Sequence, residues 1–111
     1  MSSRYETCSD FSVPYVYILR CADNALYIGS TANLSARMER HRAGNASRFT
    51  AARRPVTLVY SECFSSARLA GDRERQLKRW TRAKKEALIA GNAELLKRLA
   101  TAQGRGANRR G

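Results

Sequence analysis

The chain has 111 residues and a mass of 12.4 kDa, which allows one domain with a modest core. Its 21 lysines and arginines against 9 aspartates and glutamates give a net charge of +12, so the surface attracts polyanions. Nucleic acid is the first candidate, while membrane attraction or simple solubility fits the charge equally well. The longest apolar stretch, residues 13–19, is too short to span a bilayer, which excludes a transmembrane segment there.

The three cysteines, Cys8, Cys21 and Cys63, lie far apart and form no C-x-x-C pair. Neither a disulfide framework nor a zinc knuckle is therefore predicted. The N-terminus also lacks the basic start of a signal peptide. These features favour a cytoplasmic protein with no membrane partner.

Three segments are expected along the chain. Residues 1–12 are polar and without a period, which predicts a flexible leader. Residues 13–100 carry the periodic patterns of one folded domain. Residues 101–111 are rich in glycine and arginine, which predicts a basic, disordered tail.

A β-hairpin is predicted from position 15 onward, because apolar and tyrosine side chains alternate there. The apolar set is expected to form the core face: Val16, Ile18, Leu26 and Ile28. The other face is expected to carry Tyr15, Tyr17, Tyr27 and Gly29. Asp23 and Asn24 supply the turn. A two-residue loop would put Tyr17 and Tyr27 on opposite faces, so we expect an odd loop length or a bulge.

A first helix is predicted over residues 34–42, because Asn33 can cap its start and Gly44 can end it. Arg37 and His41 lie four positions apart and therefore project from one side of this helix. A polar, basic loop is expected over 44–54. A third strand follows over 56–63, where β-branched and aromatic residues are frequent.

A second helix is predicted over residues 67–80, with Ser65 or Ser66 as its cap. Its apolar stripe consists of Ala67, Ala70, Leu77 and Trp80. Glu74 falls on the same stripe, where a carboxylate needs a partner. Thr81 can cap a third helix that runs to residue 89, and a final amphipathic segment carries Leu95, Leu96 and Leu99.

Four of these side chains offer the groups that phosphodiester hydrolysis requires. Tyr17 could take the proton of the attacking water if Arg37 or a metal ion lowered its pKa. Arg37 can hold the scissile phosphate with its planar fork, and His41 could assist proton transfer or hydrogen-bond Tyr17. Glu74 is the one carboxylate predicted to face inward, which makes it the candidate ligand for a single hydrated Mg²⁺.

Each position also has a structural explanation. Tyrosines often pack half-buried in strands, and a lone helical histidine is usually a surface polar group. Arg37 could be an ordinary surface charge, and Glu74 could pair with Arg73 or Lys78 on a solvated face. The order and spacing of the whole set favour catalysis over several unrelated packing roles.

The set resembles the GIY-YIG nuclease family, in which a hairpin with two tyrosine motifs leads into a helix with an essential arginine. Here 15–17 reads Tyr-Val-Tyr where Gly-Ile-Tyr is usual, and 27–29 reads Tyr-Ile-Gly, as in the second motif. The resemblance covers roughly residues 14–89. It implies catalytic roles for Tyr17, Tyr27, Arg37, His41 and Glu74, with Glu74 as the metal ligand.

One position departs from the family pattern. Some members carry an asparagine where this chain has Glu86, so the contact that such an asparagine supports is in doubt. The segments 48–50, 53–55 and 77–80 further resemble the small stand-alone bacterial members of the family.

The expected fold is α/β, with a small three-stranded, mostly antiparallel sheet flanked by helices. The expected function is that of an endonuclease, dependent on Mg²⁺ or Mn²⁺, that hydrolyses DNA phosphodiester bonds in DNA repair or processing. No second domain is predicted to read sequence, so we expect it to recognise branched, flapped or single-stranded DNA or to be weakly sequence-specific. Five basic side chains are the candidate backbone contacts: Arg48, Arg53, Arg54, Lys84 and Lys85.

Two other functions remain open at this stage. A non-catalytic nucleic-acid-binding module with the same fold, on DNA or RNA, would show the same salt-sensitive binding. A small interaction module that recruits a larger repair assembly would depend on the last helix and the tail.

Overall fold

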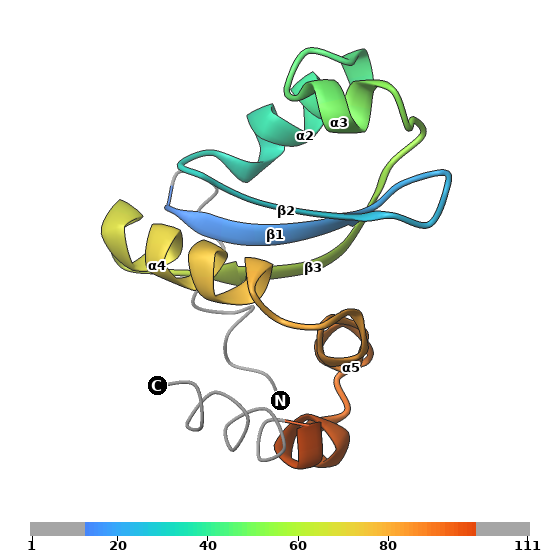
Figure 1. The fold of residues 1–111 in the computed structure, drawn as a ribbon. Coiled ribbons are helices and arrows are strands. Elements are labelled where there is room, and N and C mark those ends of the chain that lie inside the picture. Colours follow the sequence, from blue (N-terminus) through green and yellow to red (C-terminus); the bar gives the residue numbers. More distant parts are fainter. Residues whose placement is uncertain (1–12, 100–111) are drawn as a thin grey trace. The chain divides into compact units, whose positions relative to one another are not determined.

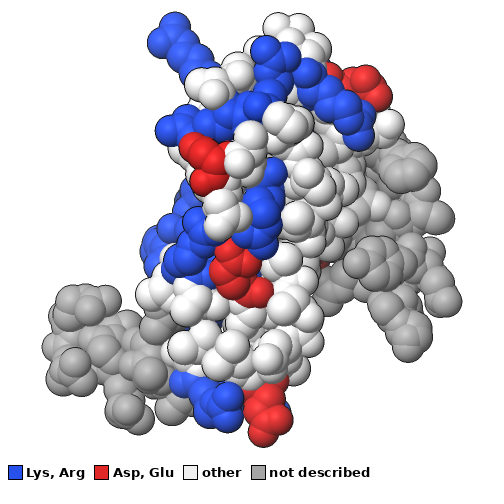
Figure 2. Space-filling model, turned by 90° about the vertical axis from the view of Figure 1, so that its right-hand side faces the viewer, with Lys and Arg blue, Asp and Glu red and all other residues white. Residues whose placement is uncertain are grey.

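The computed structural model describes residues 13–99 (Figure 1). The chain falls into two compact units that divide between Lys78 and Arg79, and each is described here by itself. The predicted leader, 1–12, and tail, 101–111, lie outside the described residues. The excess of basic residues is visible in Figure 2, where Lys and Arg side chains are more widespread than Asp and Glu on the face shown.

The first unit contains a three-stranded sheet in the order β2-β1-β3. Its strands are β1 (Tyr15–Arg20), β2 (Leu26–Thr31) and β3 (Thr57–Cys63), and both pairings are antiparallel. Helices lie on both faces of this sheet (Figure 1). The predicted α/β fold with a small antiparallel sheet is therefore confirmed.

The register of the hairpin places the two motif tyrosines on the same face. Because β1 ends at residue 20 and β2 begins at residue 26, the loop has an odd length, as expected. Asn24 adopts a left-handed conformation in this loop, with φ of 72°. Tyr17 pairs with Gly29, and Leu19 pairs with Tyr27. Since paired residues project from the same face, Tyr17 and Tyr27 share one face.

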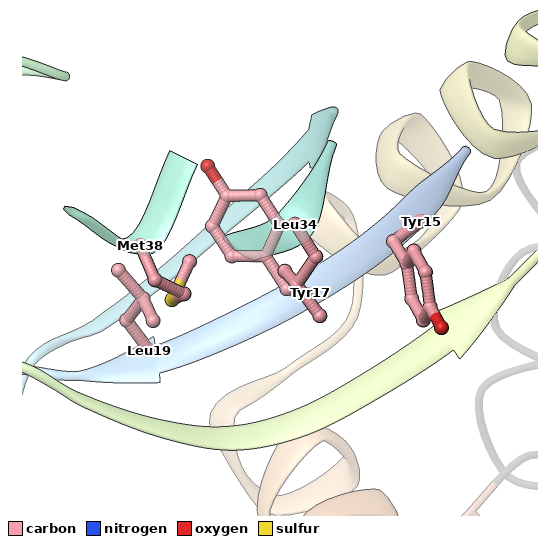
Figure 3. Packing of buried hydrophobic residues seen from close by; sticks show 5 residues of the cluster. All are labelled: Tyr15, Tyr17, Leu19, Leu34 and Met38. Carbon is pink, nitrogen blue, oxygen red and sulfur yellow. The ribbon is translucent and has the colours of Figure 1, made fainter. Parts of the chain in front are cut away.

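Both faces of β1 are buried, which corrects the expectation of a single core face. The tyrosine-bearing face belongs to a cluster of Tyr15, Tyr17, Leu19, Leu34 and Met38 (Figure 3). The last two residues of that cluster come from α2 (Leu34–Ala43). On the opposite face α4 (Ala67–Lys78) packs against β1 and β2. A central strand covered on both sides is apolar throughout, so alternation alone does not identify the core face.

The helix that carries Arg37 and His41 begins and ends as predicted. The Asn33 side chain accepts a hydrogen bond from the amide of Ala36 at 3.0 Å, and Gly44 ends α2 with a φ of 80°. The segment predicted as a loop contains a short helix, α3 (Arg48–Ala51), capped by Ser47. Four residues are too few to give a helical period, so the sequence pattern does not reveal it.

The end of α4 was predicted two residues too late, since the helix stops at Lys78. Its start is correct, because the Ser66 hydroxyl accepts from the amide of Leu69 at 3.2 Å. Ala70 and Leu77 are buried, as the apolar stripe predicts, whereas Ala67 is exposed at the first position of the helix, contrary to the prediction.

In residues 79–99, the described part of the second unit, the regular structure is helical. Thr81 caps α5 (Arg82–Ala90), and Gly91 ends it with a φ of 71°. Residues 93–99 are also helical, and the Asn92 side chain accepts from the amide of Leu95 at 3.0 Å. Among residues 13–99, no helix has the length and apolar character needed to cross a bilayer.

The cysteines differ from expectation at one position. Cys21 is buried and free, whereas Cys63 is disulfide-bonded. Sequence spacing does not show which cysteines meet in the fold, so this pairing was not predicted.

Candidate active site

The ring of Tyr17 lies against the backbone of the edge strand β2. It is completely buried, and a β-carbon built on Gly29 would lie 2.6 Å from its hydroxyl oxygen and 2.8 Å from Cζ. Only a glycine at this paired position leaves room for the ring. The last residue of the second tyrosine motif therefore determines where the first motif's hydroxyl lies.

The Tyr17 hydroxyl forms a buried hydrogen bond with His41. Its oxygen is 2.9 Å from Nε2 of the imidazole, and Nδ1 of the same ring is 2.9 Å from the Thr50 hydroxyl on α3. His41 and Thr50 are both fully buried. Tyr27 packs beside this pair, with its ring centroid 5.4 Å from that of His41 and 6.4 Å from that of Tyr17.

Arg37 reaches the same hydroxyl from the start of α2. Its NH1 is 3.4 Å from the Tyr17 oxygen and 3.4 Å from the carbonyl oxygen of Ser30. The guanidinium also borders a surface cleft of about 290 Å³, which is lined by Pro14, Ser30, Thr31, Ala32, Arg37, Ala67 and Ala70. Ser30 and Thr31 of β2 contribute to this lining, so the cleft lies beside the edge strand.

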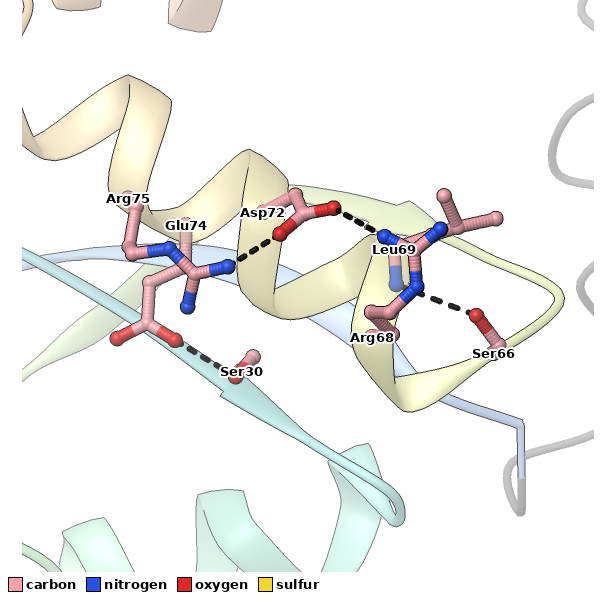
Figure 4. A network of polar contacts seen from close by, with 7 residues as sticks. All are labelled: Ser30, Ser66, Arg68, Leu69, Asp72, Glu74 and Arg75. Carbon is pink, nitrogen blue, oxygen red and sulfur yellow. Dashed lines mark hydrogen bonds and ion pairs between the residues drawn. The ribbon is translucent and has the colours of Figure 1, made fainter.

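Glu74 approaches from α4, on the opposite face of the sheet from Tyr17. Its Oε1 accepts from the Ser30 hydroxyl at 2.7 Å (Figure 4), and its Oε2 is 2.8 Å from the Lys78 ammonium. Because β2 is an edge strand, Ser30 links the carboxylate on one face to Arg37 on the other. The alternative pairing with Lys78 is thus present, whereas Arg73 pairs with Glu62 at 3.1 Å instead.

The surroundings shift the pKa values of three side chains at this site. Burial raises the pKa of the Tyr17 phenol, and the hydrogen bond from Arg37 opposes this without cancelling it. Burial also lowers the pKa of His41, and the charges of Arg37 and Arg40 lower it further. Burial alone would raise the pKa of Glu74, but hydrogen bonds from Lys78 and Ser30 outweigh it, so this pKa is lowered. At neutral pH, Tyr17 and His41 are therefore neutral and Glu74 is charged.

The comparison with known proteins decides the family. The sequence matches the family model described as the GIY-YIG catalytic domain over residues 13–87. The chain belongs to the GIY-YIG catalytic-domain family. This membership identifies it as a nuclease-type enzyme whose substrate is a nucleic acid and whose family generally uses divalent metal ions.

The similar proteins are small UPF0213 proteins. One from Bacillus pumilus (strain SAFR-032) is 47% identical over 75 residues, which make up 68% of this chain and 76% of the relative. One from Staphylococcus haemolyticus (strain JCSC1435) is 48% identical over 75 residues, which make up 68% of this chain and 92% of the relative. A solution NMR structure of a UPF0213 protein from Bacillus halodurans is 35% identical, covers 71% of this chain and 84% of that one, and has a TM-score of 0.49. The prediction of small single-domain relatives is confirmed.

The donors at this GIY-YIG site suit one hydrated ion. Among residues 13–99, no three His, Cys, Asp or Glu side chains gather as metal ligands. Mg²⁺ keeps several waters and needs only one or two carboxylates. The Glu74 side chain is charged, 22% exposed and fixed by Ser30, so it fits such an ion once Lys78 moves aside.

The predicted nucleic-acid contacts of the GIY-YIG domain have different surroundings. Arg48 is exposed at the start of α3. Arg53 binds Asp23 at 3.0 Å and lies 3.9 Å above the Phe49 ring. Arg54 donates to the carbonyl oxygens of residues 42 and 51, so both residues have structural contacts of their own.

The two predicted lysine contacts belong to the second unit. Lys84 is buried, with its ammonium 4.2 Å above the Trp80 ring, and Lys85 is half-buried on the same helix. Glu86, the residue that departs from the family pattern, pairs with Arg82 at 2.9 Å.

Three residues at the GIY-YIG site were not predicted to act there. Ser30 and Thr50 bind the predicted residues Glu74 and His41, and Lys78 was considered only as a surface partner. Serine, threonine and lysine are common at surfaces, so their types gave no signal. The cap preference of Ser47 is the one pattern that could have placed Thr50, because it predicts a turn of helix there.

Substituting Gly29 tests the packing of Tyr17. In Gly29→Ala the new methyl group would overlap the buried ring, so we expect a loss of about 1–3 kcal/mol in unfolding free energy and a displaced hydroxyl. Thermal unfolding measures the loss. Gly71→Ala is the matched control, because its methyl group would meet only Arg75, at 3.7 Å; a helical alanine should raise stability. Equal behaviour of the two variants would contradict the packing described.

Stability should also depend on the protonation of His41. Folding lowers the pKa of His41 below its ordinary value of 6.5. Between the pKa of the folded protein and 6.5, the unfolded chain therefore binds more protons than the folded one. The free energy of unfolding should therefore fall as the pH drops below about 6.5, whereas the Glu74 contribution is lost only below about 4.5. Thermal unfolding at several pH values checks this. His41 is the chain's only histidine. If the unfolding free energy of His41→Gln still fell below about pH 6.5, the lowered pKa of His41 would not be the cause.

Proposed function

We propose that this chain is an Mg²⁺-dependent endonuclease that hydrolyses phosphodiester bonds of DNA, with Tyr17, Tyr27, Arg37, His41 and Glu74 as its catalytic residues. The observation that carries the proposal is the position of the Tyr17 hydroxyl, between a guanidinium at 3.4 Å and an imidazole nitrogen at 2.9 Å. A buried phenol with one cation and one base beside it is suited to moving a proton next to a phosphate.

The raised pKa of Tyr17 changes the proton path expected from sequence. A free phenolate is disfavoured, because burial outweighs the effect of Arg37. Neutral His41 can instead accept the phenolic proton at Nε2 while the Tyr17 oxygen takes a proton from the attacking water. The water oxygen then bonds to phosphorus and the bond from phosphorus to the leaving oxygen breaks. Tyr27 supports this step by packing against both rings.

Arg37 and Glu74 are the residues that would stabilise the negative charge of the phosphate, Arg37 directly and Glu74 through a bound metal ion. Arg37 borders the cleft and can donate to two phosphate oxygens, which stabilises the charge that develops during attack. Glu74 would hold the metal ion at the edge of β2. A bound Mg²⁺ would supply charge stabilisation for the phosphate and the leaving oxygen.

The proposed substrate class rests on charge. A net charge of +12 attracts the phosphate backbone, which carries no base sequence information. We therefore propose structure-directed or weakly sequence-specific cleavage of DNA, in the cytoplasm and in repair or processing. Of the three proposed backbone contacts in the first unit, Arg48 is the best placed, because it is exposed while Arg53 and Arg54 have structural contacts of their own. A larger repair assembly as partner is part of the same proposal.

A substrate panel tests this function. Purified full chain is incubated with labelled duplex, single-stranded, flapped and branched DNA, and with matching RNA, with Mg²⁺ or with a chelator. We expect cleavage only with the metal ion, and most on the branched or flapped DNA. Salt-sensitive binding of every substrate without cleavage would instead favour a non-catalytic binding module.

A further inference from the structure

We infer that Thr50 is a positioning residue of this site: it fixes the tautomer of His41 that carries its proton on Nδ1, so that the Nε2 lone pair faces the Tyr17 hydroxyl. The effect of this tautomer on cleavage rests on the proposed function. The tautomer itself can be observed without any reaction.

The first step concerns the proton of Thr50. Its hydroxyl oxygen is 2.9 Å from Nδ1 of His41 and 3.3 Å from the carbonyl oxygen of Ser47. A hydroxyl has one proton to donate, and a carbonyl oxygen can only accept. Since the Ser47 carbonyl takes that proton, the Thr50 oxygen must accept from His41, which places a proton on Nδ1.

The second step starts from the other side of the imidazole and is independent of the first. In the part of the chain that is described, the Tyr17 hydroxyl has polar contacts with His41 and Arg37. A guanidinium has donors and no acceptor. The buried phenol is therefore satisfied when it donates to an Nε2 that carries a lone pair, whereas an Nε2–H would leave the phenolic proton without an acceptor among the described residues. Both steps give the same tautomer, and each buried polar atom then has a partner, as found throughout the described residues.

The third step is why this tautomer needs Thr50. A neutral imidazole exchanges between two tautomers, and the hydrogen bond at one nitrogen decides which is present. The cap at Ser47 begins α3 and places Thr50 inside its only turn, where the side chain is fully buried. The short helix thus holds the oxygen that orients the base of the proton path.

The decisive experiment is nitrogen NMR of the imidazole in the full chain at neutral pH. His41 is the only histidine in the sequence, so its two ring nitrogens are assigned without ambiguity once any purification tag is removed. We expect the wild-type protein to carry its proton on Nδ1. A proton on Nε2 would overturn the inference, whether or not the protein cuts DNA.

Two substitutions separate the hydroxyl from the packing of the side chain. Thr50→Val keeps the shape and removes the oxygen. Either tautomer then leaves one buried donor unpaired, Nδ1–H in one and the phenolic O–H in the other, so we expect a mixture of tautomers and a loss of cleavage of about 10-fold. Thr50→Ser restores the hydroxyl and should restore both readouts. A single Nδ1–H tautomer in Thr50→Val would contradict the role of Thr50.

The controls keep this result distinct from the proposed function. Thermal unfolding of each variant shows whether it is folded. If Thr50→Val is unfolded, the tautomer of Thr50→Ser is the result that tests the inference. If no protein in the series cuts any substrate, the proposed function fails, yet the tautomers of the wild-type and serine proteins still support or overturn the positioning role.

Discussion

Replacing Glu74 with glutamine should abolish metal-dependent cleavage while leaving the fold and nucleic-acid binding intact. Glutamine keeps the shape of the side chain and can still accept from the Ser30 hydroxyl, but it loses the charge that a divalent cation requires. We expect a fall of at least about 100-fold in cleavage rate. Binding should be unchanged or slightly tighter, because one negative charge near the phosphate is gone.

The structure changes the expected effect of this substitution on stability. If the Glu74 carboxylate lay on the apolar stripe without polar partners, its replacement by glutamine would leave the stability unchanged or raise it. Glu74 is instead compensated by Ser30 and Lys78, and its pKa is lowered. The Lys78 side chain is 54% exposed, so we expect a loss within about 1 kcal/mol.

Asp72→Asn is the matched control for Glu74→Gln. It removes a carboxylate from the same helix, but Asp72 pairs with Arg68 and Arg75 away from Ser30 (Figure 4). Its cleavage should stay close to that of the parent. Equal loss in both variants would mean that the charge of α4, and not a metal ligand, is responsible.

Replacing Arg37 with lysine should lower cleavage by about 100-fold with near-normal folding. Arg37 contacts Tyr17 and Ser30, and its planar fork would also hold a phosphate in the cleft. Lysine keeps the charge, but a single ammonium cannot reproduce that fork. Steady-state cleavage at saturating substrate measures the loss, and circular dichroism checks the fold.

Arg42→Lys controls for a general effect of this substitution on α2. Arg42 is exposed and pairs with Glu39 at 3.0 Å, so its replacement should leave cleavage within about twofold, since exposed ion pairs contribute little. Unchanged cleavage in Arg37→Lys would show that Arg37 is only a surface charge.

The hairpin and the first helix could be predicted because each has a strong local signal. Alternation fixes the strand faces, Asn33 and Gly44 mark the ends of α2, and the spacing of Arg37 and His41 puts them on one side of it. These local rules bring four of the proposed catalytic residues, Tyr17, Tyr27, Arg37 and His41, to one face of the sheet.

The remaining features depend on contacts between distant segments. Glu74 lies on the other face, and its link to the site passes through Ser30 at the edge of β2. Thr50 comes from a helix too short to show a helical period, and only the cap preference of Ser47 marks its start. The pKa of Tyr17 is raised because burial dominates, and burial on both faces of β1 follows from the packing of α2 and α4 and not from alternation.

The most direct test of the central claim is cleavage of a labelled branched DNA by the full chain and by Glu74→Gln, prepared in parallel. We predict that the wild-type protein with Mg²⁺ yields discrete fragments ending in a phosphate and a hydroxyl, as phosphodiester hydrolysis requires. The chelated sample and the variant should yield none, although both bind the DNA. Equal cleavage by the variant, or no cleavage by the wild-type protein on any substrate, would contradict the account.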